Sequence, residues 1–356
     1  MSNDGMNYAP KGKPNPVVSK GEFEIAAAFL DHGHIFGMCN GLLEAGATLK
    51  YVYDPDSKKV DDFLNKFPTA KVASSFEQIL EDDSIKLVAA AAVPSKRSSI
   101  GNRVLKSGKD YFTDKTPFTT LKQLEETKRI VQQTKRKYLV YFSERIHVEA
   151  AVFAEELINK GAIGEVIQVT GFGPHRLNAE SRPSWFFDKE KYGGILTDIG
   201  SHQIEQFLHY TGNEDAKVLH SKVGNYNNPE HPELEDYGDA TLVGDNGATF
   251  FFKVDWFTPD GLSTWGDGRT FITGTKGTIE IRKYVDVARD TAGDHLYLVN
   301  NKGETHHKLY GKVGFPYFGN LIKDCIYRTE KAITQERTFK AAELCLRAQE
   351  KAEVII

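Results

Sequence analysis

The sequence predicts an α/β fold with two domains, the first built on a doubly wound parallel sheet and the second an α+β domain with an open, mainly antiparallel sheet. A chain of 356 residues is too long for one ordinary hydrophobic core. Up to about residue 145, short apolar segments alternate with helical ones, which is typical of a parallel sheet. Beyond that point strand-like segments dominate, separated by Gly, Asn and Asp turns.

The first domain is predicted over residues 23–145. Residues 23–30 form a short apolar run bounded by turn residues, and a helical stretch leads from it to a second strand at 48–53. The alternation then continues with strands near 72 and at 87–93, 110–113 and 138–142, and helices at 58–66, 76–80, 98–106 and 121–133. About six strands in this order predict a Rossmann domain. Residues 1–22, rich in Pro, Lys, Gly and Asn, are predicted to be an N-terminal arm.

The second domain, residues 146–356, is predicted to bind substrate and to form subunit contacts. A helix reaches residue 160, a strand follows at 165–172, and another helix begins after Gly200. Strands are then predicted at 240–243, 248–254, 270–272, 278–281 and 295–299. A last helix at 341–352 places Leu344 and Leu346 to pack onto a domain, and that domain can be the first one.

Composition narrows the class of partner and the compartment. The formal net charge is -4 and the pI is about 6.3, so no basic field favours nucleic acid or an anionic membrane. Cys39, Cys325 and Cys345 show no CxxC spacing, which argues against a disulfide framework and a thiolate zinc site. The N-terminal segment lacks the apolar run of a signal peptide, and no stretch reaches 18 apolar residues. We therefore expect a cytoplasmic protein.

The turn after the first strand reads LDHGHIFG, where a dinucleotide site needs backbone N–H groups at a helix N-terminus. Aligning Gly33 with the middle glycine of GxGxxG puts Asp31 and Phe36 where the other two glycines belong. The alternative is an ordinary turn between strand and helix. The residues expected to contact the cofactor are His32, Gly33, His34, Ile35, Asp54, Pro94, Lys115 and Arg145.

Asp54 follows the second strand, where a carboxylate can accept both hydroxyls of the adenosine ribose. This favours NAD(H) as the cofactor. Ser57, Lys58 and Lys59 come directly after it and offer contacts to a 2′-phosphate, so NADP(H) stays as the alternative. A turn or helix-capping role for Asp54 is the structural alternative.

Two segments carry candidate catalytic residues. Lys115 lies just past the carboxyl end of a predicted parallel strand, where open α/β sheets bind their ligands. In GGILTDIGSHQ, Asp198 and His202 are four residues apart and are predicted to share one helix face. The ordinary alternatives are a solvated lysine, a capping aspartate and a packed histidine.

Together these segments resemble the Gfo/Idh/MocA oxidoreductases, over about residues 23–352. The family's GK-x4-EKP run is similar to GKDYFTDKTP here, and its GG-x-L-x-D-x-G-x-H segment matches residues 193–202. The sequence departs from the family pattern at Asp114, which replaces a glutamate, and at Thr116, which stands between the lysine and the proline. The resemblance implies that Lys115 binds the reacting hydroxyl, that His202 transfers its proton, and that Asp198 lies beside it.

The chemistry agrees with these roles, because moving a hydride from a carbinol carbon requires removal of the hydroxyl proton. His202 can accept that proton, Lys115 can stabilise the developing alkoxide, and Asp198 can orient the imidazole. The polar loop before the catalytic helix suits a small polyhydroxylated ligand. The predicted substrate-binding residues are Lys115, His175, Arg176, Asn178, Trp185 and His202.

Two other functions compete with a sugar or polyol dehydrogenase or reductase. The glycine-poor turn fits a catalytically silent sensor of dinucleotide or sugar on the same fold. Asp198, His202 and His175 have the residue types of a metal-dependent hydrolase or isomerase, although no spacing fixes a third ligand and no metal is predicted. The family resemblance implies a homodimer or homotetramer.

Overall fold

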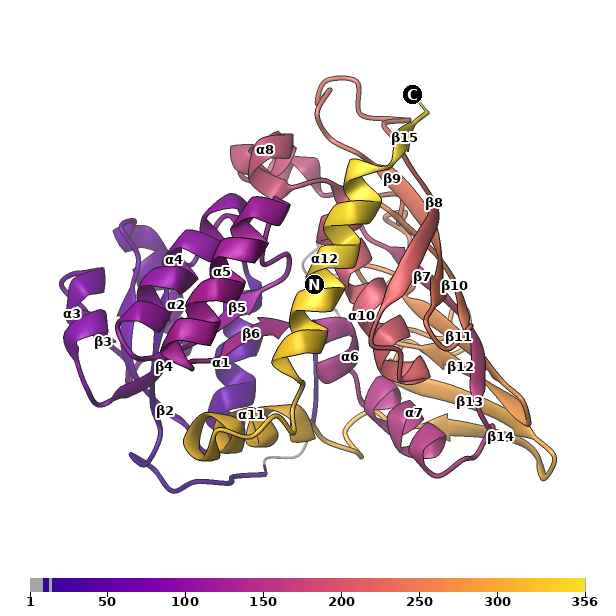
Figure 1. Ribbon diagram of the computed structural model, residues 1–356, viewed down its shortest axis with the longest axis horizontal. Helices are drawn as coiled ribbons and strands as arrows, with labels where there is room; N and C mark the ends of the chain where they lie inside the picture. Colours follow the sequence, from indigo (N-terminus) through magenta and orange to yellow (C-terminus); the bar gives the residue numbers. More distant parts are fainter. Residues whose placement is uncertain (1–8, 13–14, 356) are drawn as a thin grey trace. The chain divides into compact units, whose positions relative to one another are not determined.

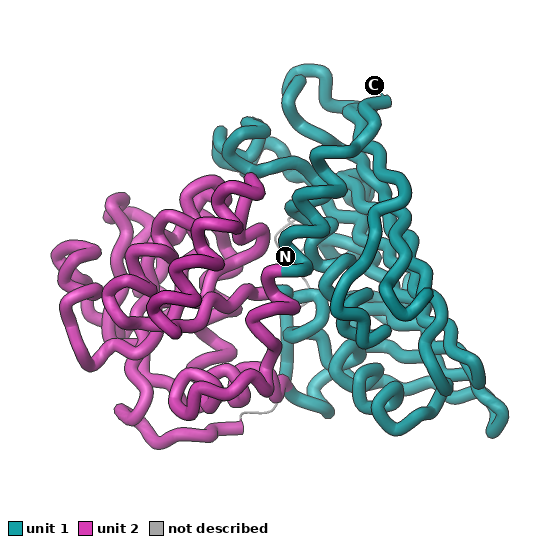
Figure 2. The backbone as a smooth tube through the Cα atoms, viewed as in Figure 1, with its two compact units in different colours: residues 1–13, 142–314, 340–356 teal, residues 14–141, 315–339 magenta. Residues whose placement is uncertain are grey.

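The computed structural model describes residues 9–12 and 15–355 (Figure 1), and contacts divide the chain into two compact units (Figure 2). Unit 1 combines residues 1–13, 142–314 and 340–356, and unit 2 combines residues 14–141 and 315–339. The N-terminal domain predicted at 23–145 therefore lies largely in unit 2. Unit 2 also takes residues from the predicted arm and a segment, 315–339, that had been placed in the second domain.

Unit 2 is built on a parallel six-stranded sheet in the order β3-β2-β1-β4-β5-β6, which confirms the Rossmann prediction. Each strand is followed by a helix or a turn that returns the chain to the same edge. The strands are β1 (Glu24–Ala28), β2 (Thr48–Tyr53), β3 (Lys71–Val72), β4 (Ile85–Ala90), β5 (Asp110–Asp114) and β6 (Tyr138–Tyr141). The helices are α1 (His34–Glu44), α2 (Ser57–Lys66), α3 (Phe76–Glu81), α4 (Pro94–Lys106), α5 (Leu121–Thr134) and α11 (Pro316–Tyr327).

Helices cover both faces of this sheet, as the side chains of β5 demonstrate. Successive residues of a strand point to opposite faces. Tyr111 lies against Gly101 of α4, and a side chain at Gly101 would collide with its ring. Phe112 contacts Tyr317 and Phe318 of α11 instead. Burial on both faces explains why β4 and β5 have almost no exposed residues.

The sequence pattern does not predict α11. Its presence in unit 2 is the main difference between the expected and the observed fold. The ring of Phe318 occupies the space that a side chain at Gly41 of α1 would need. Residues near the start of the described chain join the same unit, since the backbone of Val17 donates to the carbonyl of Ala45. Segments remote in sequence thus complete the Rossmann unit.

Unit 1 is built on a nine-stranded sheet in the order β14-β13-β12-β11-β7-β10-β9-β8-β15. It is mainly antiparallel, as predicted, with parallel pairs at β10 and β7 and at β15 and β8. Its strands are β7 (Val166–Pro174), β8 (Ala216–Gly224), β9 (Tyr237–Gly244), β10 (Thr249–Asp255), β11 (Arg269–Gly274), β12 (Gly277–Arg282), β13 (His295–Asn300), β14 (Gly303–Lys308) and β15 (Glu353–Val354). Strands β8, β14 and β15 were not predicted. Strand β14 has no apolar residue, and β15 is only two residues long.

Helices pack on one face of this sheet (Figure 1). The rings of Phe207 in α10 and Phe250 in β10 stack with centroids 4.7 Å apart. The helices of unit 1 are α6 (Ser143–Ile146), α7 (Glu149–Asn159), α8 (Lys189–Tyr192), α9 (Ile195–Asp198) and α10 (Gly200–Thr211), together with the end of α12 (Gln335–Glu350). Within residues 9–12 and 15–355 no helix is both long and apolar enough to cross a membrane.

Candidate functional site

In unit 2, the turn between β1 and α1 leaves open space beside the helix N-terminus. Gly33 is the N-cap of α1, and the first backbone N–H of the helix, that of His34, donates to His32 Nδ1 at 3.3 Å. A side chain at Gly33 would meet nothing within 4 Å, although its φ of -61° would suit any residue. The glycine is therefore not required by the local backbone. It leaves a gap at a helix N-terminus, where a pyrophosphate can approach.

Asp54 lies at the end of β2 and holds this turn. Its Oδ2 accepts a hydrogen bond from the backbone N–H of Leu30 at 2.7 Å, and its Oδ1 accepts one from Asp56 at 2.8 Å. Each carboxylate oxygen has a second lone pair, so the residue keeps acceptor capacity for a ribose hydroxyl. The turn role that the sequence left open is therefore real, and it does not compete with the proposed ribose contact.

The side chains of the turn converge on Asp114, the last residue of β5. His34 Nδ1 lies 2.8 Å from Asp114 Oδ1, and His32 Nδ1 lies 3.2 Å from Oδ2. Arg97 of α4 places Nη2 3.1 Å from Oδ2 and also donates to the carbonyl of Lys115. Neither Arg97 nor Asp114 was among the predicted site residues. For Asp114 the sequence did hold a sign, because this residue replaces the glutamate of the family pattern.

Burial raises the pKa of the Asp114 carboxyl, but His34 and Arg97 outweigh it and hold the pKa well below its usual value. Burial and the neighbouring His34 hold the pKa of His32 well below its ordinary value, helped by Lys115 and Arg97. His32 is therefore neutral at pH 7. The cations near this carboxylate are Arg97, which pairs with it, and Lys115.

Lys115 follows β5 directly and is buried. Its backbone N–H donates to Asp114 Oδ1 at 2.7 Å, and its peptide bond to Thr116 is cis. Pro94 is the first residue of α4, beyond the end of β4, and Ile35 is buried in the first turn of α1. These predicted residues therefore lie at the carboxyl edge of the sheet, on three neighbouring strand ends.

Lys59 was considered as a contact for a 2′-phosphate. Its ammonium lies 2.5 Å from Asp31 Oδ1, while Asp31 Oδ2 accepts a hydrogen bond from the backbone of Val93. Asp31, which stands in place of the first glycine of the fingerprint, therefore links the turn to α2 and to the end of β4. The neighbouring Lys58 is exposed.

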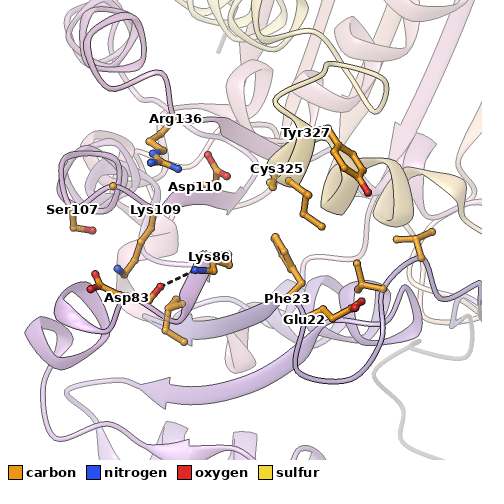
Figure 3. A pocket seen from close by; sticks show the side chains of 15 residues that line it. Glu22, Phe23, Asp83, Lys86, Ser107, Lys109, Asp110, Arg136, Cys325 and Tyr327 are labelled. Atoms are coloured by element: carbon orange, nitrogen blue, oxygen red, sulfur yellow. Dashed lines mark hydrogen bonds between the residues drawn. The ribbon is translucent and has the colours of Figure 1, made fainter.

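A cavity of about 820 Å³ opens elsewhere in unit 2 (Figure 3). Its lining includes Phe23, which precedes β1, and Ile85 and Asp110, the first residues of β4 and β5. It therefore lies at the amino ends of the strands. Parallel α/β sheets bind ligands at the opposite, carboxyl ends. We accordingly place the candidate cofactor site at the turn and not in this cavity.

In unit 1, Asp198 and His202 lie on two short helices and not on one. Asp198 ends α9, His202 is in the first turn of α10, and Ile199 joins the two. The single helix predicted to carry both residues is therefore divided at Ile199. Ile199 has φ -73° and ψ -38°, so the backbone dihedral angles stay helical across the junction. His202 is buried, with an exposed fraction of 2%.

A buried carboxylate in α6, Glu144, lies at the centre of a polar cluster in the same unit. Its Oε2 accepts hydrogen bonds from Lys283 Nζ at 2.6 Å and from Gln203 Nε2 at 2.9 Å. His175 Nε2 lies 3.9 Å from Oε1. Burial raises the pKa of Glu144, but Lys283, His202 and His175 lower it to about 2. Glu144 is thus ionised and acts electrostatically on both predicted histidines.

Glycine in β7 allows α10 to approach this cluster. A side chain at Gly171 would collide with the Gln203 amide, which lies directly over the strand. His175 follows the end of β7, so the close packing of strand and helix sets the position of both elements. Glu144 and Lys283 were missed in the sequence because neither has a spacing motif.

The predicted substrate loop contains both structural and accessible residues. Arg176 is buried, and its Nη2 donates to the carbonyls of Pro259 and Leu262 at 2.8 and 2.7 Å. That side chain holds the neighbouring loop, so we withdraw it as a substrate contact. Asn178 has a left-handed backbone with φ 48°, and both it and Trp185 are partly exposed. These two residues and His175 remain candidates.

Arg145 was predicted to bind the cofactor, but its side chain is committed to another partner. Its Nε lies 2.8 and 2.9 Å from the two carboxylate oxygens of Glu205, and Nη2 lies 2.6 Å from one of them. Both residues are buried in unit 1. This bidentate pair ties α6 to α10, and we therefore omit Arg145 from the proposed cofactor contacts.

Residues 9–12 and 15–355 contain two clusters with the ligand types and spacing for a metal ion, His32–His34–Asp114 and Asp286–His295–His306. Neither includes Asp198, His175 or His202. The alternative of a metal-dependent hydrolase built on those three residues therefore gains no support from the arrangement.

Solved and curated proteins include clear relatives of this chain. A crystal structure from Erwinia carotovora atroseptica SCRI1043, described as that of an oxidoreductase, is 51% identical with a TM-score of 0.91, covering 94% of this chain and 100% of that one. The scyllo-inositol 2-dehydrogenase (NAD(+)) of Bacillus subtilis is 26% identical over 242 residues, 66% of each protein. The D-xylose dehydrogenase of Paenarthrobacter nicotinovorans is 26% identical over 149 residues, 40% of this chain and only 38% of that protein.

Family assignment follows from the two halves of the chain. Residues 28–142 match the oxidoreductase family with an NAD-binding Rossmann fold. Residues 152–280 match the GFO/IDH/MocA C-terminal domain. The two matches together cover more than half of the sequence and agree with the two sheets described above. The chain belongs to the Gfo/Idh/MocA family of oxidoreductases.

Proposed function

We propose that this oxidoreductase transfers a hydride between a nicotinamide dinucleotide and a carbinol or ketone carbon of a sugar, an inositol or a related polyol. The observation that carries the proposal is the carboxyl edge of the parallel sheet in unit 2. There Gly33, Asp54 and Lys115 follow the ends of β1, β2 and β5. Phosphate, ribose and reacting group are recognised at such edges in doubly wound sheets.

The residues at this edge fit a dinucleotide. The open space at Gly33 gives the pyrophosphate access to the α1 N-terminus, and the neighbouring Arg97 and Lys115 favour its negative charge. Asp54 has lone pairs for the ribose hydroxyls, which favours NAD(H) over NADP(H). When bound, the nicotinamide accepts or supplies the hydride. Pro94 and Ile35 are the apolar residues proposed to line the site.

On the substrate side, we assign the proton transfer to His202. Oxidation of a carbinol releases a hydride and a proton, so a base must accept the proton from the hydroxyl. The ionised Glu144 favours the protonated form of a nearby imidazole, which is the form that this step produces. Lys115 is assigned to the developing alkoxide and Asp198 to the orientation of His202. His175, Asn178 and Trp185 are the proposed contacts to the remaining hydroxyls.

The names of two relatives support this substrate class. One is named as a scyllo-inositol 2-dehydrogenase and the other as a D-xylose dehydrogenase, and inositol and xylose are both polyhydroxylated. Their low identity leaves the individual sugar open to experiment. The proposal is accordingly limited to polyhydroxylated carbon skeletons.

The test is a pair of measurements on the purified chain. Fluorescence titration with NADH and with NADPH should show saturable binding that is tighter for NADH. Turnover should then appear on a panel of inositols, pentoses and hexoses. Saturable cofactor binding without turnover on the panel would favour the catalytically silent sensor. Absence of binding by either dinucleotide would refute the proposal.

A further inference from the structure

A second polar cluster lies in unit 1 on strands β12, β13 and β14. Leu296 and Leu298 of β13 are buried on the face that packs against α7, so the alternate residues His295 and Tyr297 point to the other face. Tyr297 is paired in register with His306 of β14. Asp286 lies in the loop that connects β12 to β13. Three elements thus bring two imidazoles and a carboxylate together.

The ligand atoms of this cluster converge. His295 Nδ1 lies 2.9 Å from His306 Nε2, and a carboxylate oxygen of Asp286 lies within 4.8 Å of both. His295 Nε2 lies 3.1 Å from the carbonyl oxygen of Ala292, which can only accept. The proton of a neutral His295 is therefore on Nε2, and the Nδ1 lone pair points into the cluster. This is the tautomer that a metal ligand requires.

Neighbouring side chains hold two of these three residues in place. The Tyr297 hydroxyl donates to Asp286 Oδ2 at 2.6 Å, and the ring of Tyr297 stacks on that of His306 with centroids 4.2 Å apart. Arg282 donates to Asp286 Oδ1 at 2.5 Å and is shared with Glu280. Metal ligands are commonly fixed by such hydrogen bonds to their outer atoms. Here two such bonds hold the Asp286 carboxylate, and the bond to the Ala292 carbonyl holds the His295 ring.

We propose that Asp286, His295 and His306 bind one zinc ion, with water completing its coordination. Two imidazole nitrogens and one carboxylate suit zinc and not calcium or magnesium, which prefer oxygen ligands. At Zn–N distances of about 2.0–2.1 Å, two nitrogens of a tetrahedral site lie about 3.3 Å apart. The observed 2.9 Å has to widen only slightly, and His306, exposed on the edge strand β14, can move.

The similar cluster of His32, His34 and Asp114 does not fit a cation equally well. Its carboxylate already accepts from Arg97, His34 and the backbone of Lys115, and Lys115 and Arg97 both act on His32. That environment favours an anion. At the β12–β14 cluster Asp286 also accepts from an arginine, Arg282, but Glu280 shares that guanidinium. The carboxylates of Glu280, Asp286 and Asp290 there balance the cations Arg282, Arg289 and Lys308.

Zinc at this position would join the loop 283–294 to the β13–β14 hairpin at the edge of the sheet. An ion that binds only the folded chain stabilises it by mass action. We therefore expect zinc to raise the unfolding temperature of the full chain. The proposal does not rest on the proposed dehydrogenase function, since none of the three residues belongs to that machinery.

The experiment uses the full chain after removal of metal with a chelator. Calorimetric titration with Zn²⁺, and elemental analysis after dialysis, should show one ion per chain. His306→Ala should weaken zinc binding by at least about tenfold, and Asp286→Asn should do the same. Because His306 is exposed, its truncation should leave the fold intact, which circular dichroism verifies. Co²⁺ should give visible absorption in the wild-type chain that both variants lack.

Two histidine variants serve as controls. His220→Ala removes an exposed histidine from β8 of the same sheet, and His34→Ala removes a ligand from the competing cluster. Both should bind zinc as the wild type does. Loss of binding in His34→Ala with retention in His306→Ala would overturn the proposal, as would the absence of one-to-one zinc binding in the wild-type chain. NADH binding by His306→Ala should be unchanged, which keeps this test separate from that of the cofactor site.

Discussion

Two buried carboxylates, Asp114 in unit 2 and Glu144 in unit 1, have almost no solvent exposure and depressed pKa values, yet they treat nearby histidines differently. At Asp114 the imidazoles of His34 and His32 lie 2.8 and 3.2 Å from the carboxylate. At Glu144 the direct partners are Lys283 and Gln203, and His175 lies farther away, at 3.9 Å.

We interpret this difference in distance as two roles of histidine, one in holding the fold and one in chemistry. An imidazole in direct contact with a carboxylate helps to satisfy a buried charge and gives shape to a turn. At Glu144 a lysine already pairs with the carboxylate, and the field of that ionised group favours positive charge on an imidazole nearby. On this basis we propose that the histidines of unit 2 shape the turn between β1 and α1, and that His202 of unit 1 transfers the proton.

The largest effect is expected when one histidine of each unit is replaced by alanine and the two variants are compared. His202→Ala should reduce turnover by about 10²- to 10⁴-fold, because it removes the proposed general base, and leave NADH affinity unchanged. His34→Ala should weaken NADH binding while turnover at saturating cofactor is largely kept. Steady-state kinetics and fluorescence titration measure both. Full activity in His202→Ala would show that the proton leaves by another route.

The structural role of Asp114 can be measured by removing it. Asp114→Ala leaves the buried guanidinium of Arg97 without its carboxylate, so the free energy of unfolding should fall by about 3–5 kcal/mol. Urea denaturation of the purified variant gives this value. Asp61→Ala, an exposed aspartate in α2, is the matched control and should change stability by less than about 0.5 kcal/mol. Equal effects of the two substitutions would contradict the proposed ion-pair role.

Acid should remove the stabilisation contributed by Glu144. Its pKa is about 2 in the folded chain against 4.5 normally, so the ionised group stabilises the fold above about pH 4.5. That contribution, on the order of 3 kcal/mol, is lost as the pH falls towards 2. The stability difference between wild type and Glu144→Gln, measured in urea at several pH values, should therefore shrink with acidification. A difference independent of pH would exclude a depressed pKa.

The smallest expected effect concerns Asp54, a carboxylate that combines both uses. It holds backbone N–H groups of the turn and is proposed to accept from the ribose. Asp54→Asn keeps one acceptor oxygen and should weaken NADH binding by about tenfold, with less effect on NADPH. Titrations with both cofactors decide the matter. Equal losses for the two would assign Asp54 to the turn alone.

Much of the site was readable from local sequence. Lys115 and Asp54 could be placed at strand ends because the apolar runs before them predict parallel strands, and such strands end at one edge of the sheet. Arg145 and Arg176 could not be judged in this way. Their partners, Glu205 and the carbonyls of Pro259 and Leu262, are 60 and more than 80 residues distant in sequence. A side chain's long-range partner leaves no local pattern.

The sequence by itself determined the two sheets, their approximate boundaries and the family, because alternation and periodicity are properties of neighbouring residues. Only the tertiary structure decided which polar side chains form structural hydrogen bonds and ion pairs and which are candidates for chemistry. It enclosed Glu144 with Lys283, gathered His32 and His34 on Asp114, and brought Phe318 onto α1. Those pairings arise from packing between segments remote in the chain, where the cost of burying a charge selects its partners.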